Sequence, residues 1–328
     1  MRLGFAVKVV GRPDLPSNDA RRWQTGPHLR VSLEYLDAII SYLADTQISM
    51  YRISSDLAPY VTHPDMPQFH GQIEACAEQL AALGARVRAL ELRLSFHPSQ
   101  YILLNSPDAS IVTKSIADLS AQAHMLDVMG LGPEAVVITH VGGVYGDLVS
   151  GRERWVSAYE LLPAHVRRRL VLENDDTRYS VADTLWINQR SGVPLVFDNL
   201  HHWCNDRDGI DTPAALEACL RTWPSGVRPK IHFSTPRTEM RLVDRRNRTT
   251  GKTEQVQTPP IWSGHADYIN PFEFITFMRS AANLPDFDVM FECKRKDLAL
   301  LRLREDLARY APDIAARFSE ARAYGQAA

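Results

Sequence analysis

Side chains that bind metal ions or transfer protons recur near the ends of short apolar runs in this 328-residue chain. They are His97, His140, Glu173, Asp198, His232 and Glu292. His201 follows Asp198 by three residues, and His265 follows the charged segment 236–260, from which it could fold back to the same place. A single one of them is more often a helix cap or a hydrogen-bonded core residue. Here six successive runs carry such a residue, and so many polar groups in one place would be costly without a bound partner. We therefore predict a metal centre.

The ligand types restrict the metal. Nitrogen and oxygen ligands without cysteine suit Mn²⁺, Zn²⁺, Fe²⁺ or Mg²⁺, and the share of imidazoles argues against Mg²⁺ alone. The ligand set exceeds what one ion needs, so we expect two or three ions. Paired ions roughly 4 Å apart can clamp both oxygens of an in-line phosphoryl displacement, and metal-bound water supplies hydroxide near neutral pH. This chemistry suits phosphodiester hydrolysis, although sugar isomerases also use paired metals.

The spacing of two pairs of these side chains supports the prediction that they share one metal centre. Asp198 and His201 are three residues apart and can face one ion if a strand turns directly into a helix there, which leaves His202 without a ligand role. Lys230 and His232 are two apart, so they share the inward face of one strand. An ammonium beside metal ligands requires a depressed pKa, a carboxylate partner or chemical modification.

Apolar runs and amphipathic stretches alternate along the chain, which predicts parallel strands connected by helices. The predicted strands are 3–9, 48–53, 91–96, 135–139, 170–172, 195–197, 230–233 and 288–291. The predicted helices are 29–44, 68–89, 107–129, 152–166, 180–191, 212–221, 271–282 and 295–310. Eight such units without a composition break predict an α/β fold, a single (β/α)₈ TIM barrel as one domain over residues 1–328. In such a barrel, groups at the carboxyl ends of the strands converge on one mouth.

Residues 236–260 interrupt this alternation and form a basic insertion after the seventh strand. Residues 237–252 hold six basic and two acidic side chains, although the whole chain has 37 basic and 39 acidic residues and a net charge of −2. The segment is either a solvated hairpin, with a turn over 249–251, or an arm that binds phosphates. Near-neutral total charge therefore does not exclude DNA as a partner.

The remaining composition is that of an ordinary globular protein, with 45% hydrophobic and 23% charged residues. The four cysteines are scattered, which is typical of reduced thiols. The N-terminus lacks the pattern of a signal peptide, and no apolar run approaches the roughly 18 residues that span a bilayer. We expect a cytoplasmic protein that does not associate with membranes.

At these residues the sequence resembles the UV damage endonuclease family, which is related to apurinic endonucleases of the endonuclease IV type. The blocks that carry the resemblance are 3–5, 51–55, 94–101, 139–143, 172–176, 197–202, 230–234, 264–267 and 290–294. The resemblance implies the same eight metal ligands and a carboxylated Lys230. It also implies that Gln100 and Tyr101 wedge into the duplex opposite the lesion. Some relatives have Tyr and Asn where this chain has Phe5 and Val9, so these two positions are not assigned to DNA binding.

We predict a metal-dependent DNA repair endonuclease, with Mn²⁺ as the first choice of metal. It would nick the phosphodiester 5′ to cyclobutane pyrimidine dimers and 6-4 photoproducts by metal-hydroxide attack. The predicted catalytic residues are Glu173, Lys230, His232 and Glu292, and the predicted DNA-binding residues are Gln100, Tyr101, Arg52, Arg245, Arg246 and Arg248. The expected partner is damaged double-stranded DNA, with no obligate protein partner and a monomeric state.

Three alternatives remain at this point. The same cluster would serve an apurinic-site endonuclease. A metal-dependent sugar isomerase is less consistent with the sequence, because such an enzyme needs neither residues that wedge into a DNA duplex nor a basic segment. A non-catalytic damage binder gives no reason to assemble a metal cluster.

Overall fold

Parallel strands form two sheets in the computed structural model, which describes residues 1–319. The larger sheet has the order β3 (Arg93–Ser95), β2 (Met50–Arg52), β1 (Leu3–Ala6), β10 (Asp288–Phe291) and β7 (Lys230–Phe233). The smaller has the order β4 (Val137–His140), β5 (Leu170–Glu173) and β6 (Leu195–Val196). Isolated parallel bridges join the sheets between Phe96 and Val137 and between Asp198 and His232. The predicted α/β fold with parallel strands is confirmed.

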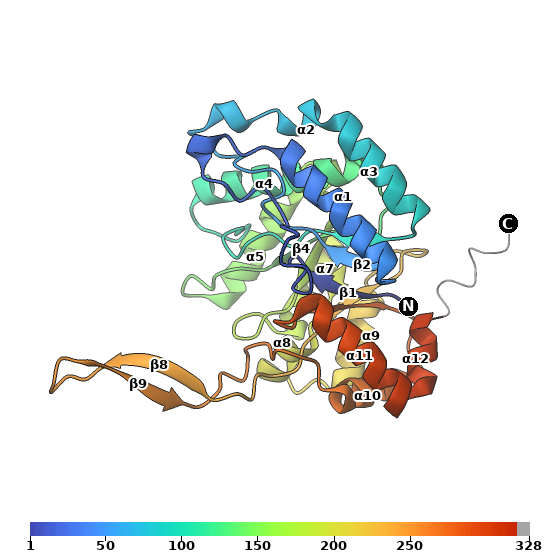
Figure 1. Cartoon of the computed structure of the whole chain (residues 1–328). Helices are drawn as coiled ribbons and strands as arrows, with labels where there is room; N and C mark the ends of the chain where they lie inside the picture. Colours follow the sequence, from blue (N-terminus) through green and yellow to red (C-terminus); the bar gives the residue numbers. More distant parts are fainter. Residues whose placement is uncertain (320–328) are drawn as a thin grey trace.

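Helices alternate with these strands along the chain and lie around the outside of the sheets (Figure 1). The longer ones are α1 (Leu29–Asp45), α3 (Ala77–Ala89), α4 (Ala109–Val128), α5 (Leu148–Glu160), α7 (Val181–Ser191), α9 (Thr212–Leu220), α10 (Pro271–Ser280) and α11 (Lys296–Tyr310). The shorter ones are η1 (Trp23–Thr25), η2 (Pro67–Phe69), α2 (Gln72–Ala75), α6 (Ala164–Arg167), α8 (Asn199–Cys204) and α12 (Pro312–Ser319). Within residues 1–319, no helix is both long and apolar enough to cross a membrane.

The strands that carry the predicted ligands are buried, as expected for parallel strands covered by helices. All four residues of β1, β5, β7 and β10 are buried. Helix α1 joins the same core through residues at three- and four-residue spacing, including Leu29, Leu33, Leu36 and Leu43. Truncating one such leucine to alanine costs about 2–5 kcal/mol. The strand ends are therefore held in place by a well-packed core.

Several predicted elements are shorter than the hydrophobic pattern suggested. The strand predicted over 3–9 ends at Ala6, because Val7 adopts a φ of 64°. The helix predicted over 68–89 is divided into η2, α2 and α3, with a break at Cys76. The helix predicted over 152–166 becomes α5 and α6 on either side of Pro163, which cannot continue a helix. Residues 320–328 of the predicted domain lie outside the described residues.

The basic segment forms an antiparallel hairpin of β8 (Arg241–Arg246) and β9 (Thr253–Thr258). Gly251 has a φ of 69° in the turn, and the Asn247 side chain accepts from the backbone of Thr249 and Thr250. Figure 1 shows the hairpin projecting away from the rest of the molecule. An antiparallel bridge between Pro236 and His265 anchors its base beside a predicted metal ligand.

At the opposite end of the sheet, a buried carboxylate ties three strands together. Asp288 at the start of β10 accepts from Nη1 of Arg93 on β3 at 3.0 Å. It also accepts from the backbone of Arg2, next to β1, at 2.7 Å. Both Arg93 and Asp288 are buried. This pairing holds β10, which leads into Glu292, against its neighbours.

Candidate metal centre

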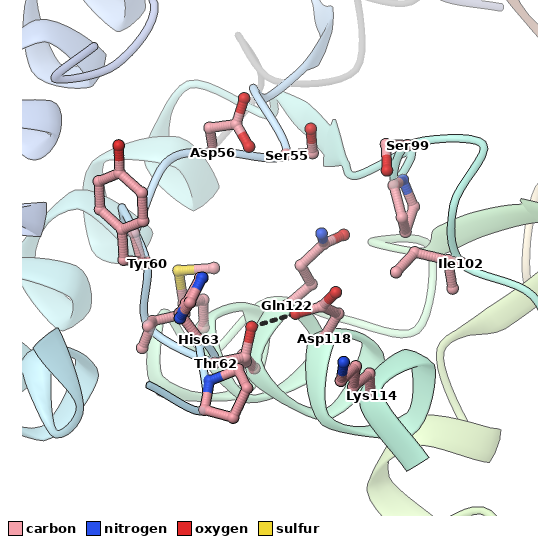
Figure 2. A pocket seen from close by; sticks show the side chains of 16 residues that line it. Ser55, Asp56, Tyr60, Thr62, His63, Ser99, Ile102, Lys114, Asp118 and Gln122 are labelled. Atoms are coloured by element: carbon pink, nitrogen blue, oxygen red, sulfur yellow. Dashed lines mark hydrogen bonds between the residues drawn. The ribbon is translucent and has the colours of Figure 1, made fainter. Parts of the chain in front are cut away.

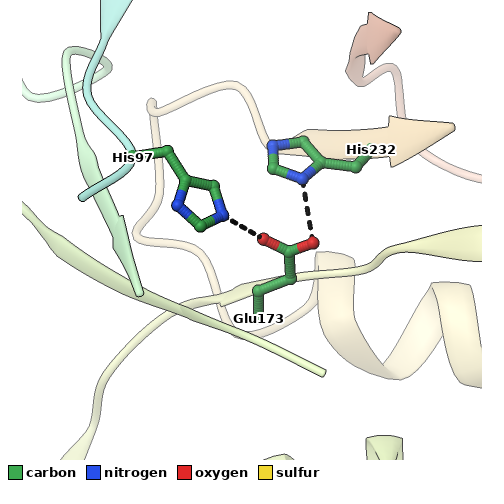
Figure 3. A group of neighbouring side chains, drawn as sticks. All are labelled: His97, Glu173 and His232. Atoms are coloured by element: carbon green, nitrogen blue, oxygen red, sulfur yellow. Dashed lines mark hydrogen bonds and ion pairs between the residues drawn. The ribbon is translucent and has the colours of Figure 1, made fainter. Parts of the chain in front are cut away.

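Glu173, the last residue of β5, lies at the centre of the predicted ligands. Its Oε2 lies 3.0 Å from Nε2 of His97, which follows β3, and its Oε1 lies 3.0 Å from Nδ1 of His232 on β7 (Figure 3). Glu173 and His232 are completely buried. Three strand ends therefore place two imidazoles on the two oxygens of one carboxylate.

The same carboxylate faces two further imidazoles. Nδ1 of His201 lies 3.4 Å from Oε1 of Glu173, and Nε2 of His140 lies 3.8 Å from Oε2. His140 ends β4, and His201 lies in the short helix α8. These three residues form a second group whose ligand atoms lie within 4.8 Å of one another.

Asp198 and Glu292 complete a third group with Glu173 and His232, within the same 4.8 Å. Glu292 follows β10, and its Oε1 lies 3.5 Å from Nδ1 of His232. Seven of the eight predicted ligands thus belong to groups that share Glu173. His265, the eighth, lies beside them, with Nε2 3.7 Å from Oε2 of Glu292 and Nδ1 2.6 Å from Oγ of Ser234.

The turn from β6 into α8 explains the three-residue spacing of Asp198 and His201. Asp198 caps the helix, with Oδ1 accepting from the backbone N–H of His201 at 2.7 Å. Asn174 fixes Asp198 from the neighbouring strand end, because its side chain bonds both the backbone N–H and the carbonyl of Asp198, at 2.9 and 3.1 Å. His202 packs against Phe197, with ring centroids 5.4 Å apart, and lies in none of the three groups.

Several buried polar atoms of the cluster have no hydrogen-bond partner. They are Oδ2 of Asp198, Nε2 of His232 and Nδ1 of His140. Buried polar groups are normally paired, and orphaned nitrogen and oxygen atoms around a shared carboxylate are what a divalent cation would satisfy. The donor set therefore fits metal ions.

The electrostatics of the cluster favour positive charge. Burial acts to raise the pKa of Glu173, but His232 and His140 and the bond from His201 hold that pKa well below its usual value. Burial acts to lower the pKa of His201, but Asp198, Glu173 and Glu292 raise it to about 11. Carboxylates that hold a proton on an imidazole this firmly would also hold a metal cation there.

Lys230 begins β7, two residues before His232, and is completely buried. Its Nζ donates to Oγ of Ser95 at 2.7 Å. Burial and the charges of Arg93 and Arg52 lower its pKa well below the usual value, against the opposing effect of Glu292 and Glu173. A depressed pKa was one of the three predicted ways to accommodate this ammonium, and the carboxylation of Lys230 stays a prediction.

Sequence reasoning missed the side chains that hold the ligands. Arg52, predicted to contact phosphate, forms an ion pair through Nη1 with Oε1 of Glu292. Ser95 accepts a hydrogen bond from Lys230, and Asn174 accepts one from the backbone of Asp198. Ser234 forms a hydrogen bond with His265. Each lies within two residues of a strand end that carries a ligand, and this position is the signal that could have identified them.

Apart from Arg52, the predicted DNA-contacting residues lie outside the three ligand groups. Gln100 lines a cavity of about 280 Å³ together with His97, His140 and His201. Tyr101, the next residue in the loop between β3 and α4, is 74% exposed. Arg245, Arg246 and Arg248 are exposed on the hairpin. Phe5 and Val9, the two departures from relatives, are both buried in the core.

Comparisons with known proteins agree on one family. A family model described as UV-endonuclease UvdE matches residues 30–320. A UV DNA damage endonuclease of Bacillus velezensis is 34% identical over 271 residues, which cover 82% of this chain and 78% of that protein. A UV DNA damage endonuclease of Bacillus cereus is 34% identical over 283 residues, which cover 85% of this chain and 82% of that protein.

Solved structures extend the comparison to the fold. The crystal structure of SacUVDE matches with a TM-score of 0.77 at 29% identity, covering 94% of this chain and 98% of that one. D-psicose 3-epimerase from Clostridium cellulolyticum H10 matches with a TM-score of 0.54 at 12% identity, covering 96% of this chain and 99% of that one. At this low identity the match shows a shared fold alone. The family model and the relatives together show that the chain belongs to the UV-endonuclease UvdE family.

Proposed function

We propose that this chain is a metal-dependent DNA repair endonuclease that nicks the strand 5′ to UV photoproducts, namely cyclobutane pyrimidine dimers and 6-4 photoproducts. The observation that carries the proposal is the convergence of six imidazoles and carboxylates on Glu173, in a chain whose exposed Tyr101 lies close to His97 in the sequence. The broader statement, a nuclease acting on DNA, follows from its family. The products would be a 3′-hydroxyl and a 5′-phosphate.

The ions would be held by His97, His140, Glu173, Asp198, His201, His232, His265 and Glu292. We propose two or three ions, with Mn²⁺ as the first choice, because the ligands mix imidazole and carboxylate. Bound ions would supply a nucleophile at neutral pH and would neutralise charge on the phosphate during in-line displacement.

The protein's own residues would orient these ligands and hold the DNA. Arg52 positions Glu292 through their ion pair, and Ser95 fixes the Nζ of Lys230. The Gln100–Tyr101 loop would wedge into the duplex, because an aromatic ring can replace stacking that a lesion has already weakened. Arg245, Arg246 and Arg248 on the exposed hairpin would contact phosphates.

We further propose that the strands close into a (β/α)₈ barrel that forms a single domain over residues 1–328, with 236–260 as a basic insertion. The bridges Phe96–Val137 and Asp198–His232 support closure, since they connect the edges of the two sheets. Cutting at one lesion requires only a monomer, so we propose no obligate protein partner. We propose the cytoplasm as the location.

The test is a nicking assay with an end-labelled duplex that carries one thymine dimer. With Mn²⁺, the purified protein should cut the lesion strand immediately 5′ to the dimer and leave an undamaged duplex intact. A duplex with one abasic site should be cut more slowly. Faster cutting of the abasic duplex would instead favour an apurinic-site endonuclease, and no cutting with any divalent ion would overturn the proposal.

A further inference from the structure

Two residues beside the metal ligands adopt a backbone conformation that their side chains disfavour. Val7, after β1, has a φ of 64°, and Lys296, after β10, has a φ of 48°. Such a positive φ is uncommon outside glycine and persists only where the surrounding structure enforces it. Because β1 and β10 are paired neighbours, both residues lie at the edge of the sheet where Glu292 follows β10.

A buried carboxylate enforces the conformation of Lys296. The next residue, Asp297, accepts from the backbone N–H groups of Val10 and Gly11, at 2.7 and 3.0 Å. It also accepts from the hydroxyl of Tyr42 on α1 at 2.8 Å. Gly11 permits this approach, because a Cβ there would lie 2.7 Å from Oδ2 of Asp297. Asp297 therefore ties the start of α11 to the loop after β1 and fixes Lys296 beside that loop.

The ammonium of Lys296 lies among other positive charges. The residue is partly buried, and within residues 1–319 its side chain forms no hydrogen bond or ion pair. Burial and the charge of Arg52 lower its pKa, the charge of Lys8 acts in the same direction, and Glu292 opposes them. Arg52 is itself already paired with Glu292. A strained lysine among like charges is costly unless an anion binds there.

The position of Lys296 indicates which anion would bind. Glu292, four residues earlier, belongs to the ligand groups, so the strand that is cut would pass close to it. Phosphates follow one another about every 3.4 Å of helix axis along one DNA strand. A cation beside the cluster would therefore meet a phosphate next to the one held by the metal ions. An ammonium, with its compact charge and three donors, suits such a contact.

We propose that Lys296 binds the backbone phosphate adjacent to the scissile one on the cut strand, in an inference that rests on the proposed function. The contact would set which linkage lies over the metal ligands. It would be made equally before and during the reaction, so it should affect KM and leave kcat unchanged.

The first test measures steady-state nicking of the thymine-dimer duplex by Mn²⁺-loaded protein. Lys296→Met keeps an unbranched side chain and removes the charge, so it should raise KM about 10-fold without changing kcat. Lys296→Arg should restore KM, because a guanidinium also binds phosphate. Bound Mn²⁺ should be equal in both variants and in the wild-type protein.

The second test identifies the phosphate. A neutral methylphosphonate replaces, one at a time, the phosphates on either side of the scissile linkage. At one of these two positions it should raise the KM of the wild-type protein about 10-fold and leave the KM of Lys296→Met unchanged, because that variant has already lost the contact.

A third variant separates phosphate binding from a role in the fold. Lys296→Gly removes the strain of the positive φ, so it should melt no lower than the wild-type protein and still show the raised KM. The matched control is Gln47→Gly, which replaces an exposed residue with a φ of 57° before β2 and should keep the wild-type KM.

Several outcomes would overturn the inference while the proposed function stands. They are an unchanged KM in Lys296→Met, no restoration of KM by Lys296→Arg, and methylphosphonate effects that are equal in the wild-type protein and Lys296→Met. A Lys296→Gly protein that melts well below the wild-type protein with an unchanged KM would assign the lysine to the fold instead. A wild-type protein that does not nick the lesion strand would overturn both proposals.

Discussion

Oε1 of Glu173 lies 3.0 Å from Nδ1 of His232, although the two residues are 59 positions apart in the chain. They meet because β5 and β7 both end at the same edge of the parallel strands, where His97 also lies. Three imidazoles besides His232 lie within 4 Å of the same carboxylate. Glu173 is therefore the residue that all three ligand groups share.

Glu173→Gln should lower Mn²⁺ affinity by at least about 100-fold and abolish nicking, because it removes the charge that all three groups share. Binding is measured by calorimetric titration, and the fold by circular dichroism. Glu74→Gln is the control, since Glu74 pairs with His124 on the surface. Normal Mn²⁺ binding by Glu173→Gln would remove Glu173 from the metal site.

Asn174→Ala should lower metal affinity by about 10–100-fold, because it releases Asp198 from two hydrogen bonds without removing a ligand. The control is Asn188→Ala, which removes a bond to the Val193 carbonyl away from the cluster. Equal Mn²⁺ affinities for the two variants, measured in the same titration, would show that Asn174 has no positioning role.

Divalent ions should raise the melting temperature of the wild-type protein. At an ion concentration of 100 times Kd, the stabilisation is about 2.7 kcal/mol. Scanning calorimetry with Mn²⁺ and with a chelator measures the shift. Glu173→Gln should melt at the same temperature in both conditions, and an equal shift in the two proteins would place the binding site elsewhere.

Replacing Arg245, Arg246 and Arg248 together by glutamine should weaken DNA binding and flatten its salt dependence. Each lost phosphate contact reduces the slope of log K against log salt by about 0.9. The control is the same replacement of the exposed Arg167, Arg279 and Arg309 on the outer helices. An unchanged slope in anisotropy titrations would identify the hairpin as a solvated surface element.

Asp288→Asn should destabilise the fold by about 3–5 kcal/mol, because it leaves the buried Arg93 charge without its partner. Urea unfolding measures the change. Asp286→Asn, which alters an exposed pair with Arg317, is the matched control and should have little effect. A similar small effect for both would mean that the buried pair does not contribute to stability.

The convergence of most of these imidazoles and carboxylates could be predicted from the sequence, because six of them lie at or near the end of a short apolar run, namely His97, His140, Glu173, Asp198, His232 and Glu292. Parallel strands bring such ends together whatever their distance in sequence. The pairing of Arg52 with Glu292 has no such local signal, because it depends on the contact between distant strand ends. The cavity of about 320 Å³ between residues 55–64 and helix α4 (Figure 2) could not be predicted for the same reason, since segments far apart in the sequence form it.

A hairpin was one of the two interpretations of residues 236–260, but its strands were not among the predicted strands, for a different reason. Strand prediction relied on buried apolar residues, whereas β8 and β9 are mostly exposed and polar. Their structure comes from pairing with each other and from the turn at Asn247 and Gly251. The turn over 249–251 was the one local signal, and it lies where the hairpin reverses.

Metal dependence is tested directly by following nicking as metal is returned to chelator-treated protein. The metal-free protein should leave a thymine-dimer duplex intact. Cutting 5′ to the dimer should appear with Mn²⁺ and saturate when two or three ions are bound per chain, while Glu173→Gln stays inactive throughout. Full cutting by the metal-free protein would show that no metal is needed, and full cutting by Glu173→Gln would show that Glu173 is not needed.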